Sequence, residues 1–190
     1  MGLDSSIKNL SDENLVQEIV KDNNSLLFSV LYDRYDKIVY NKCYSFSKSK
    51  DEAEDLTQDV FLKLFVKLNT FKGKSKFSTW LYSFTYNFCA NYVNRDRHRK
   101  ISGHSSVIDE NFDDFGYEVA EDDFSSMKAK RLKEALEIID AEDKSILLLK
   151  YQDDVSIKEL EILLDIGSSA VKMRLKRARV KIMKIYNELN

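Results

Sequence analysis

Proline is absent from this chain of 190 residues, and glycine occurs only five times, although average usage would place about nine prolines in a chain of this length. Proline interrupts helices and marks many turns, so its absence favours long helices joined by short polar connections. Hydrophobic residues make up 43% and charged residues 33%, as in a folded globular protein. No apolar run approaches the roughly 20 residues that cross a bilayer. We therefore expect an all-α protein without membrane insertion.

Cysteine and histidine are equally scarce. Cys43 and Cys89 are distant in sequence and lack a CxxC partner, and the only histidines are His98 and His104. A zinc site needs more such ligands at short spacings, so neither a metal nor a cofactor is expected. The first ten residues lack the basic patch and apolar stretch of a secretion signal. We expect a cytoplasmic protein whose two thiols are free, because the reducing cytosol disfavours disulfides.

The net charge of −2 conceals a strong segregation of charge along the chain. Residues 101–126 contain no lysine or arginine, and they include glycine and several serines. This composition is typical of a flexible linker. It predicts two small helical domains, residues 10–100 and 127–190, on either side of an acidic tether. The tether carries eight acids: Asp109, Glu110, Asp113, Asp114, Glu118, Glu121, Asp122 and Asp123.

Two basic stretches flank the acidic segment. Each contains seven lysines or arginines against a single aspartate, Asp96 in the first and Asp165 in the second. Phosphate-backbone binding is the first candidate role for such patches. The first set is Lys72, Lys74, Lys76, Arg95, Arg97, Arg99 and Lys100, and the second is Lys172, Arg174, Lys176, Arg177, Arg179, Lys181 and Lys184.

The C-terminal part of the sequence predicts a helix-turn-helix. Ser156 can cap a helix that runs through Leu164, because Glu159 completes a capping box with it. Gly167 can take the left-handed conformation that closes this helix, and Ser168 or Ser169 can cap the next one. Two more apolar helices are expected upstream, the first around Leu132, Ala135, Leu136 and Ile139, and the second over Ile146–Leu149 with Tyr151.

The last helix, from Ser168 to about Met183, is basic on every outward side. Its apolar residues recur at steps of four and three, so they form one narrow inward stripe. An ordinary surface helix usually mixes acids with its bases, and none occurs between Ser168 and Asn187. We therefore predict a recognition helix for duplex DNA, with base contacts near its N-terminus and phosphate contacts later. The stripe is Val171, Leu175, Ala178, Ile182 and Ile185.

A helix near residues 51–71 has a second unusual face. Asp51, Asp55 and Gln58 cluster there beside the aliphatic residues Leu62 and Val66. Acids around exposed aliphatic side chains suggest a protein-binding surface, but single exposed apolar residues are also normal. The pattern alone leaves both readings open. The opposite face is apolar and consists of Ala53, Leu56, Val60, Phe61 and Leu64.

The segment 77–92 contains seven aromatic residues, more than one helix face can bury. Between Trp80 and Phe88 aromatic residues alternate with others, and this period of two locally favours a strand. As a helix, the segment would place Leu81, Phe84, Phe88 and Tyr92 on one side, and Trp80 and Asn91 on another. Aromatic residues flanked by lysines and arginines are typical of sites that bind single-stranded nucleic acid. The alternative is that these aromatic side chains are simply buried in the core, which is their commoner use.

Four stretches resemble the extracytoplasmic-function (ECF) group of the bacterial sigma-70 family. DEAEDLTQDVF at 51–61 and FKGKSKFSTWLY at 71–82 resemble region two, whereas VSIKEL at 155–160 and VKMRLKRAR at 171–179 resemble region four. The resemblance extends from about Leu26 to the end of the chain. It implies an all-helical, non-enzymatic sigma factor that binds core RNA polymerase and directs it to promoters. An anti-sigma factor is a further candidate partner.

The resemblance also assigns the surfaces. The acidic helix would dock on the β′ clamp helices, region four would contact the β flap and the duplex minus-thirty-five element, and region two would melt and read the minus-ten element. The loop at 71–77 would hold a flipped-out base. The implied polymerase-binding residues are Asp51, Glu54, Asp55, Gln58 and Leu62. The minus-ten set is Phe71, Lys72, Lys74, Lys76, Phe77, Trp80, Asn87, Asn91, Arg95, Arg97 and Arg99, and the minus-thirty-five set is Ser168, Ser169, Lys172, Arg174, Lys176, Arg177 and Arg179.

The sequence departs from the family pattern at two places. Ile138-Ile139-Asp140-Ala141 stands where a Leu-Pro turn usually enters the first major helix of region four, and Met173 replaces a common serine. By resemblance, the acidic linker is expected to pass through the RNA-exit channel of the polymerase.

Two other function classes compete with this interpretation. A helix-turn-helix regulator that is not a polymerase subunit explains residues 156–183 equally well, but gives the N-terminal half no role. Such a regulator would bind DNA without co-purifying with core polymerase. A nucleic-acid enzyme would need clustered acids for a metal, or a nucleophile beside a base, and the sequence offers neither.

The free chain is predicted to bind DNA weakly, because the seven bases of the last helix are offset by eight linker acids. At physiological salt the full-length protein should bind no more tightly than the roughly micromolar range of non-specific binding. Fluorescence anisotropy with a labelled duplex measures this affinity. Tight binding by the isolated chain would contradict the prediction.

Overall fold

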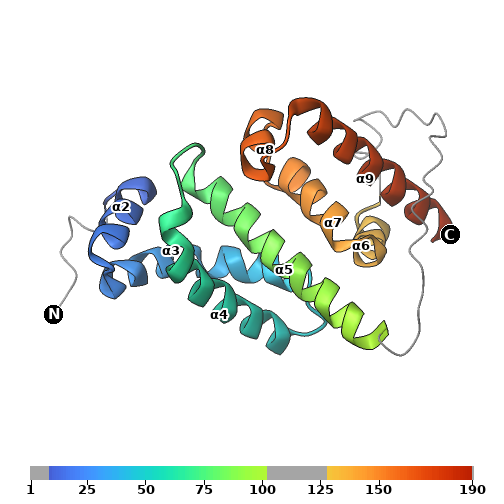
Figure 1. The fold of residues 1–190 in the computed structure, drawn as a ribbon. Coiled ribbons are helices and arrows are strands. Elements are labelled where there is room, and N and C mark those ends of the chain that lie inside the picture. Colours follow the sequence, from blue (N-terminus) through green and yellow to red (C-terminus); the bar gives the residue numbers. More distant parts are fainter. Residues whose placement is uncertain (1–8, 102–127, 190) are drawn as a thin grey trace. The chain divides into compact units, whose positions relative to one another are not determined.

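The structure is a computed structural model that describes residues 9–101 and 128–189, with the side chains of residues 98–101 left out. All regular elements in these residues are helical, which confirms the all-α prediction there (Figure 1). The eight acids of the predicted linker lie outside the described residues. The helices are α2 (Asp12–Asp22), α3 (Ser25–Tyr44), α4 (Lys50–Lys67), η1 (Leu68–Thr70), α5 (Phe77–Ile101), α6 (Ala129–Ile138), α7 (Ala141–Leu147), η3 (Leu148–Gln152), α8 (Ile157–Leu164) and α9 (Ser168–Glu188).

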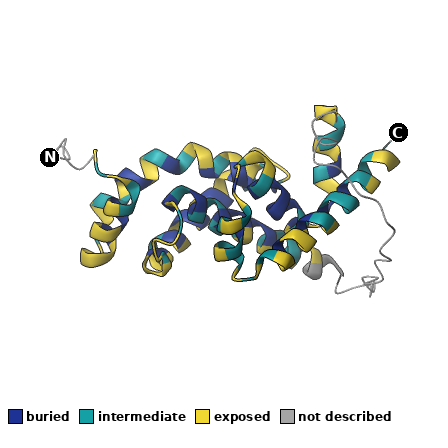
Figure 2. Cartoon of the chain, turned by 90° about the horizontal axis from the view of Figure 1, so that it is seen from above, coloured by how far each residue is buried: buried dark blue, intermediate teal, exposed yellow. Residues whose placement is uncertain are grey.

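The chain divides into two compact units, Met1–Cys89 and Ala90–Asn190. The division falls inside α5, so this helix contributes its first half to one unit and its second half to the other. In each unit the buried residues gather on the sides that the helices turn toward one another (Figure 2).

In the first unit α3 and α4 pack side by side through aromatic and aliphatic residues. The rings of Phe28 and Phe65 lie 5.0 Å apart in an edge-on contact, and those of Tyr32 and Phe61 lie 4.5 Å apart. Ser49 begins α4 by accepting a bond from the amide of Glu52. The predicted apolar face of α4 is confirmed as core, since Ala53, Leu56, Val60, Phe61 and Leu64 are each at most 4% exposed.

Helix α2 is tied to α3 by a short network around one carboxylate. Asp12 accepts bonds from Arg34 at 2.6 Å and from the hydroxyl of Tyr35 at 2.5 Å. Burial, followed by the bond and charge of Asp12, raises the pKa of Tyr35 above its ordinary value, so this hydroxyl stays protonated as a donor. Ser11 caps the start of α2 and Asn23, in the left-handed conformation, ends it.

The aromatic segment 77–92 is helical, so the local strand pattern was a wrong guide to its structure. The described residues of this helix that are completely buried are Phe77, Leu81, Thr85, Tyr86 and Cys89. At 3.6 residues per turn they cover roughly half of the helix circumference, so the helix is enclosed on more than one side. One side of this helix was predicted to consist of Leu81, Phe84, Phe88 and Tyr92. Leu81 is fully buried, whereas the three aromatic residues of that side are half-buried. Burial of this helix against the rest of the unit outweighs the local β-propensity of its residues.

Two buried polar contacts join α3 to α5. Lys42 is 3% exposed, and its ammonium donates to the hydroxyl of Tyr86 at 3.0 Å. The free thiols of Cys43 and Cys89 are 3.7 Å apart. The bond with Cys89, aided by one with Thr57, lowers the pKa of Cys43 despite the opposing effect of burial. Both cysteines are therefore core residues.

In the second unit the predicted inward stripe of α9 is confirmed. Val171, Leu175, Ala178 and Ile182 are at most 4% exposed, and Ile185 is half-buried. Upstream, α7 begins at Ala141, directly after Asp140, and a short π-helix follows it at Leu148–Gln152. Helix α7 therefore starts within Ile138-Ile139-Asp140-Ala141, the segment that stands in place of the usual Leu-Pro turn.

The turn between α8 and α9 confirms one predicted cap and corrects another. The capping box at the start of α8 is present, because Ser156 accepts from the amide of Glu159, whose carboxylate accepts from the amide of Ser156. The left-handed residue is Asp165 (φ 52°), however, and Gly167 (φ −69°) is the N-cap of α9. Neither Ser168 nor Ser169 caps α9, since Ser168 is already its first residue. An aspartate tolerates the left-handed region, so the glycine was not needed there.

Ser156→Ala is predicted to destabilise the second unit by about 1 kcal/mol, because it removes the hydroxyl that accepts from the amide of Glu159 and donates to its carboxylate. Ser169→Ala is the matched control, since Ser169 is exposed in the first turn of α9 and caps nothing. Urea unfolding followed by circular dichroism compares the two variants with wild type. Equal effects from both serines would contradict this account of the turn.

Candidate nucleic-acid and protein interfaces

The first half of α9 presents its bases to solvent. Lys172, Arg174 and Arg177 are exposed, as is Ser169, whereas Ser168 is half-buried. These side chains surround the part of the helix that directly follows the turn after α8. The predicted N-terminal contact residues are therefore accessible on one helix end, as a major-groove recognition helix requires.

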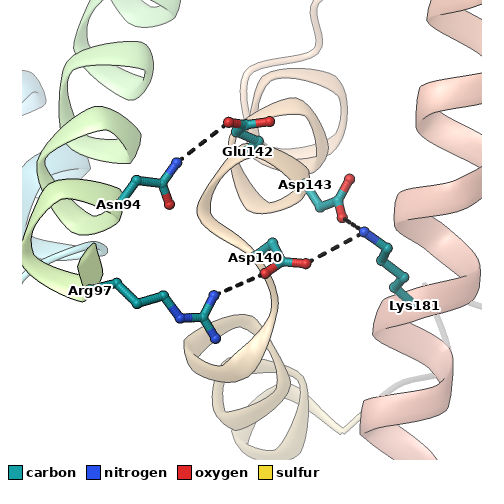
Figure 3. A network of polar contacts seen from close by, with 6 residues as sticks. All are labelled: Asn94, Arg97, Asp140, Glu142, Asp143 and Lys181. Carbon is teal, nitrogen blue, oxygen red and sulfur yellow. Dashed lines mark hydrogen bonds and ion pairs between the residues drawn. The ribbon is translucent and has the colours of Figure 1, made fainter. Parts of the chain in front are cut away.

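Several other lysines and arginines of α9 are less accessible, because they form hydrogen bonds or ion pairs within the second unit. Lys181 donates to Asp143 at 2.5 Å and to Asp140 at 3.4 Å (Figure 3). Burial lowers the pKa of Lys181, but the bond and charge of Asp143 and of Asp140 outweigh it and raise the pKa above its ordinary value. The guanidinium of Arg179 lies 3.5 Å from the hydroxyl of Tyr151, and Lys176 is half-buried. Three of the four exposed bases of α9, Lys172, Arg174 and Arg177, thus lie in its first half, and the fourth, Lys184, lies near its end.

The last part of α5 carries further predicted DNA contacts, within the second unit. Arg97 donates to Asp140 at 3.2 Å, and Asn94 donates to Glu142 at 3.4 Å (Figure 3). Arg97 remains 60% exposed, so this ion pair is open to competition from a phosphate. Arg95 is exposed, and the side chain of Arg99 lies outside the described residues.

The start of α5 and the loop before it form an aromatic cluster. The ring of Trp80 lies 5.4 Å from that of Phe71 and stacks on Phe84 at 5.5 Å. Phe77 is fully buried beneath them, so it would support a nucleic-acid site by holding Phe71 and Trp80 in place. The lysines of the loop, Lys72, Lys74 and Lys76, are exposed, as are Asn87 and Asn91 farther along the helix.

Sequence reasoning missed one contact at this site. Glu13 of α2 accepts a bond from the backbone amide of Phe77 at 3.0 Å, which fixes the first turn of α5. A carboxylate suits this place because the first amides of a helix lack partners and carry partial positive charge. The two residues are 64 positions apart, and no local pattern links them.

The outer face of α4 combines acids with exposed aliphatic side chains. Leu62 is 69% and Val66 71% exposed. The other predicted polymerase contacts, Asp51, Glu54, Asp55 and Gln58, are exposed along the same helix. A hollow of about 350 Å³ between α3 and α4 adjoins this face, lined by Tyr32, Asp36, Lys37, Tyr40, Asn41, Glu54, Thr57 and Gln58.

No three His, Cys, Asp or Glu side chains in the described part of the chain are close enough together to hold a metal ion. No described helix is long and apolar enough to cross a membrane.

Comparisons with protein families match both parts of the chain. Residues 31–99 match the model of Sigma-70 region 2, and residues 129–182 match that of Sigma-70, region 4. Together the two matches cover more than half of the sequence.

Similar proteins extend over nearly the whole chain. The ECF RNA polymerase sigma factor SigW of Bacillus subtilis is 26% identical over 176 residues, 90% of this chain and 94% of SigW. The ECF RNA polymerase sigma-E factor of Escherichia coli is 28% identical over 180 residues, 91% of this chain and 93% of its own.

Two solved structures share the fold. The sigma factor RpoE of Bartonella quintana, solved in complex with the anti-sigma factor NepR, has a TM-score of 0.56 at 21% identity and covers 84% of this chain and 96% of its own. CnrH, solved in complex with the cytosolic domain of CnrY, has a TM-score of 0.59 at 18% identity and covers 93% of this chain and 97% of its own.

The lysines and arginines of α9 are predicted to have two different roles, and a substitution in each group should change a different property, either protein stability or DNA affinity. Lys181→Ala should lower the free energy of unfolding by about 1 kcal/mol and leave DNA affinity nearly unchanged. Arg174→Ala should leave stability unchanged and weaken binding to a duplex selected by the wild-type chain at low salt, by about tenfold. Thermal unfolding and anisotropy titrations measure the two quantities. A loss of stability in Arg174→Ala, or a loss of DNA affinity in Lys181→Ala, would contradict the assignment.

The contribution of Lys181 should also depend on pH in one direction. Because its pKa in the folded protein lies above the ordinary 10.5, the stabilisation is complete at neutral pH and is lost as the pH rises through the folded pKa. In Lys181→Ala this alkaline loss of stability should be smaller than in wild type.

Proposed function

The chain belongs to the sigma-70 family as an ECF RNA polymerase sigma factor, and we propose that three of its surfaces divide the work of promoter recognition. A sigma factor binds core RNA polymerase and directs transcription initiation at promoters. The proposal concerns which residues make each contact. Its main support is that accessible basic and aromatic groups lie on α5 and α9, whereas exposed aliphatic groups lie among acids on α4.

The outer face of α4 is the contact with core polymerase, on the β′ clamp helices. Leu62 and Val66 expose more apolar surface than most other described side chains, which is costly unless a partner covers it. Asp51, Glu54 and Asp55 add negative charge along the same face and would attract a basic partner. The family matches favour the interpretation of this face as a protein-binding surface over its interpretation as an ordinary solvent-exposed surface.

The loop at 71–77 and the start of α5 contact the opened minus-ten element. Phe71 and Trp80 supply rings on which unpaired bases can stack, and the exposed lysines of the loop can hold the backbone. The exposed Asn87, Asn91 and Arg95 continue the same role along α5.

Helix α9 reads the minus-thirty-five element as duplex. Ser169, Lys172 and Arg174 face solvent at its first turns, where a recognition helix reaches base edges. Arg177 lies one turn later as a phosphate contact, and Lys176 and Arg179 would join it after local rearrangement. The second unit would also contact the β flap.

The remaining assignments follow from the same role. The protein acts in the cytoplasm as a polymerase subunit and performs no chemistry of its own. The structures of RpoE with NepR and of CnrH with the cytosolic domain of CnrY support an anti-sigma factor as a further partner. A regulator that binds DNA without polymerase, the alternative weighed from the sequence, would leave the α4 surface without a function, and the two sigma-70 family matches speak against it.

Leu62→Arg tests the polymerase contact. An arginine at this exposed position should reduce affinity for core polymerase at least about tenfold, because it replaces buried apolar contact with an unpaired charge. Ile38→Arg is the control, since Ile38 is also an exposed aliphatic residue, 38% accessible, on α3. Affinity is measured by fluorescence titration of core polymerase, and circular dichroism checks folding. Equal binding by wild type and Leu62→Arg would reject the role of α4.

A further inference from the structure

We propose that α2 forms one wall of a pocket that receives an unpaired promoter base, and that Gln17 reads the hydrogen-bonding edge of that base. The proposal rests on the proposed role of the loop at 71–77 in the opened promoter. It adds a specificity-determining residue from a helix that precedes the matched family region, which begins at residue 31.

The pocket lies between α2 and the segment that joins α4 to α5, two parts that sit side by side (Figure 1). Its volume is about 390 Å³, within the range of roughly 300–1,000 Å³ that small-molecule sites occupy. The α2 wall consists of Glu13, Val16, Gln17, Val20 and Lys21, and the opposite wall of Asn69, Phe71, Lys72 and Gly73.

Helical spacing gives the α2 wall its chemistry. Glu13, Gln17 and Lys21 are four residues apart, so they lie one above another along one side of the helix. Val16 and Val20 run beside them and make the floor partly apolar. The wall therefore presents an acceptor, then an amide, then a cation, in order along the pocket.

The opposite wall suits a planar ligand. The half-buried ring of Phe71 offers a stacking surface, and it is held by its edge-on contact with Phe77, whose ring centroid is 5.4 Å away. Gly73 has a φ of +66°, and open space surrounds the position of its missing side chain. The chain can thus turn tightly here and leave the pocket unobstructed.

Glu13 acts as the positioning residue of this pocket. Its Oε1 accepts from the amide of Phe77, which anchors the loop to α2 at a fixed distance. In the described part of the chain no other donor bonds to Glu13. Its second oxygen can therefore accept from a ligand.

The charges favour a nucleobase over a free anion as the occupant. Glu13 would repel a phosphate inside the pocket, whereas the exposed Lys21 and Lys72 at its rim can hold the phosphates on either side of an inserted base. An amide such as Gln17 can both donate to and accept from a base edge. An acceptor beside it favours bases with an exocyclic amino group, namely adenine, cytosine and guanine, over thymine.

Transcription from a promoter library tests the proposal in the holoenzyme. Core polymerase with wild-type or Gln17→Ala protein initiates on promoters randomised across the minus-ten element, and sequencing of the transcripts gives the base preference at each position. Gln17→Ala should reduce the preference at one position by about five- to tenfold and leave the other positions unchanged. Glu18→Ala, an exposed neighbour on α2 that does not line the pocket, should behave as wild type.

Glu13→Gln provides a second variant that keeps the loop in place. Its amide oxygen can still accept from Phe77, but its amino group can now donate to a keto oxygen. At the same promoter position thymine should become at least about threefold more frequent.

The outcomes separate this inference from the proposed function. If wild type initiates specifically but Gln17→Ala gives an unchanged profile, the base-reading role is wrong and the sigma function stands. A uniform loss of initiation on all sequences would indicate a structural role for Gln17 and also overturn the proposal. Absence of specific initiation by wild type would instead refute the proposed function.

Discussion

Burial of the first half of α5 is the interaction on which the arrangement of the first unit depends. Phe77, Leu81, Tyr86 and Cys89 are fully enclosed, and each fully buried large side chain contributes roughly 1.5–3 kcal/mol. The bond between Lys42 and Tyr86 and the contact of the two thiols add polar partners from α3. With α5 fixed in this way, Phe71 and Trp80 are held at the surface at one end of the helix, while α4 keeps its acidic and aliphatic face toward solvent.

The same principle organises the second unit around α9. Its inward stripe is apolar and its other sides are basic, so packing the stripe presents Lys172, Arg174 and Arg177 to solvent. Asp140 and Asp143 then engage Lys181 and remove part of the charge from the outer surface. Most of the exposed charge of this helix therefore lies in its first half, which follows the turn and where a recognition helix contacts base edges, and Lys184 near its end is also exposed.

Periodicity predicted those elements whose two sides differ clearly in polarity. The apolar faces of α4 and α9 and the capping box at Ser156 could be read from sequence because each depends on residues three or four positions apart. The aromatic helix could not, since the alternation from Trp80 to Phe88 imitates a strand and only tertiary burial decides against it. The choice of Asp165 over Gly167 as the left-handed residue was likewise invisible, because both residue types tolerate that conformation. Glu13 and Lys42 act across 64 and 44 positions, beyond the reach of any local pattern.

The central claim is that this chain gives core polymerase its promoter specificity. Run-off transcription with purified core polymerase, followed by mapping of the 5′ ends over genomic templates, tests it most directly. The account predicts discrete start sites that require the chain and share an upstream pair of sequence elements. Transcription that is unchanged by adding the chain, or DNA binding by the chain without any defined start site, would contradict it.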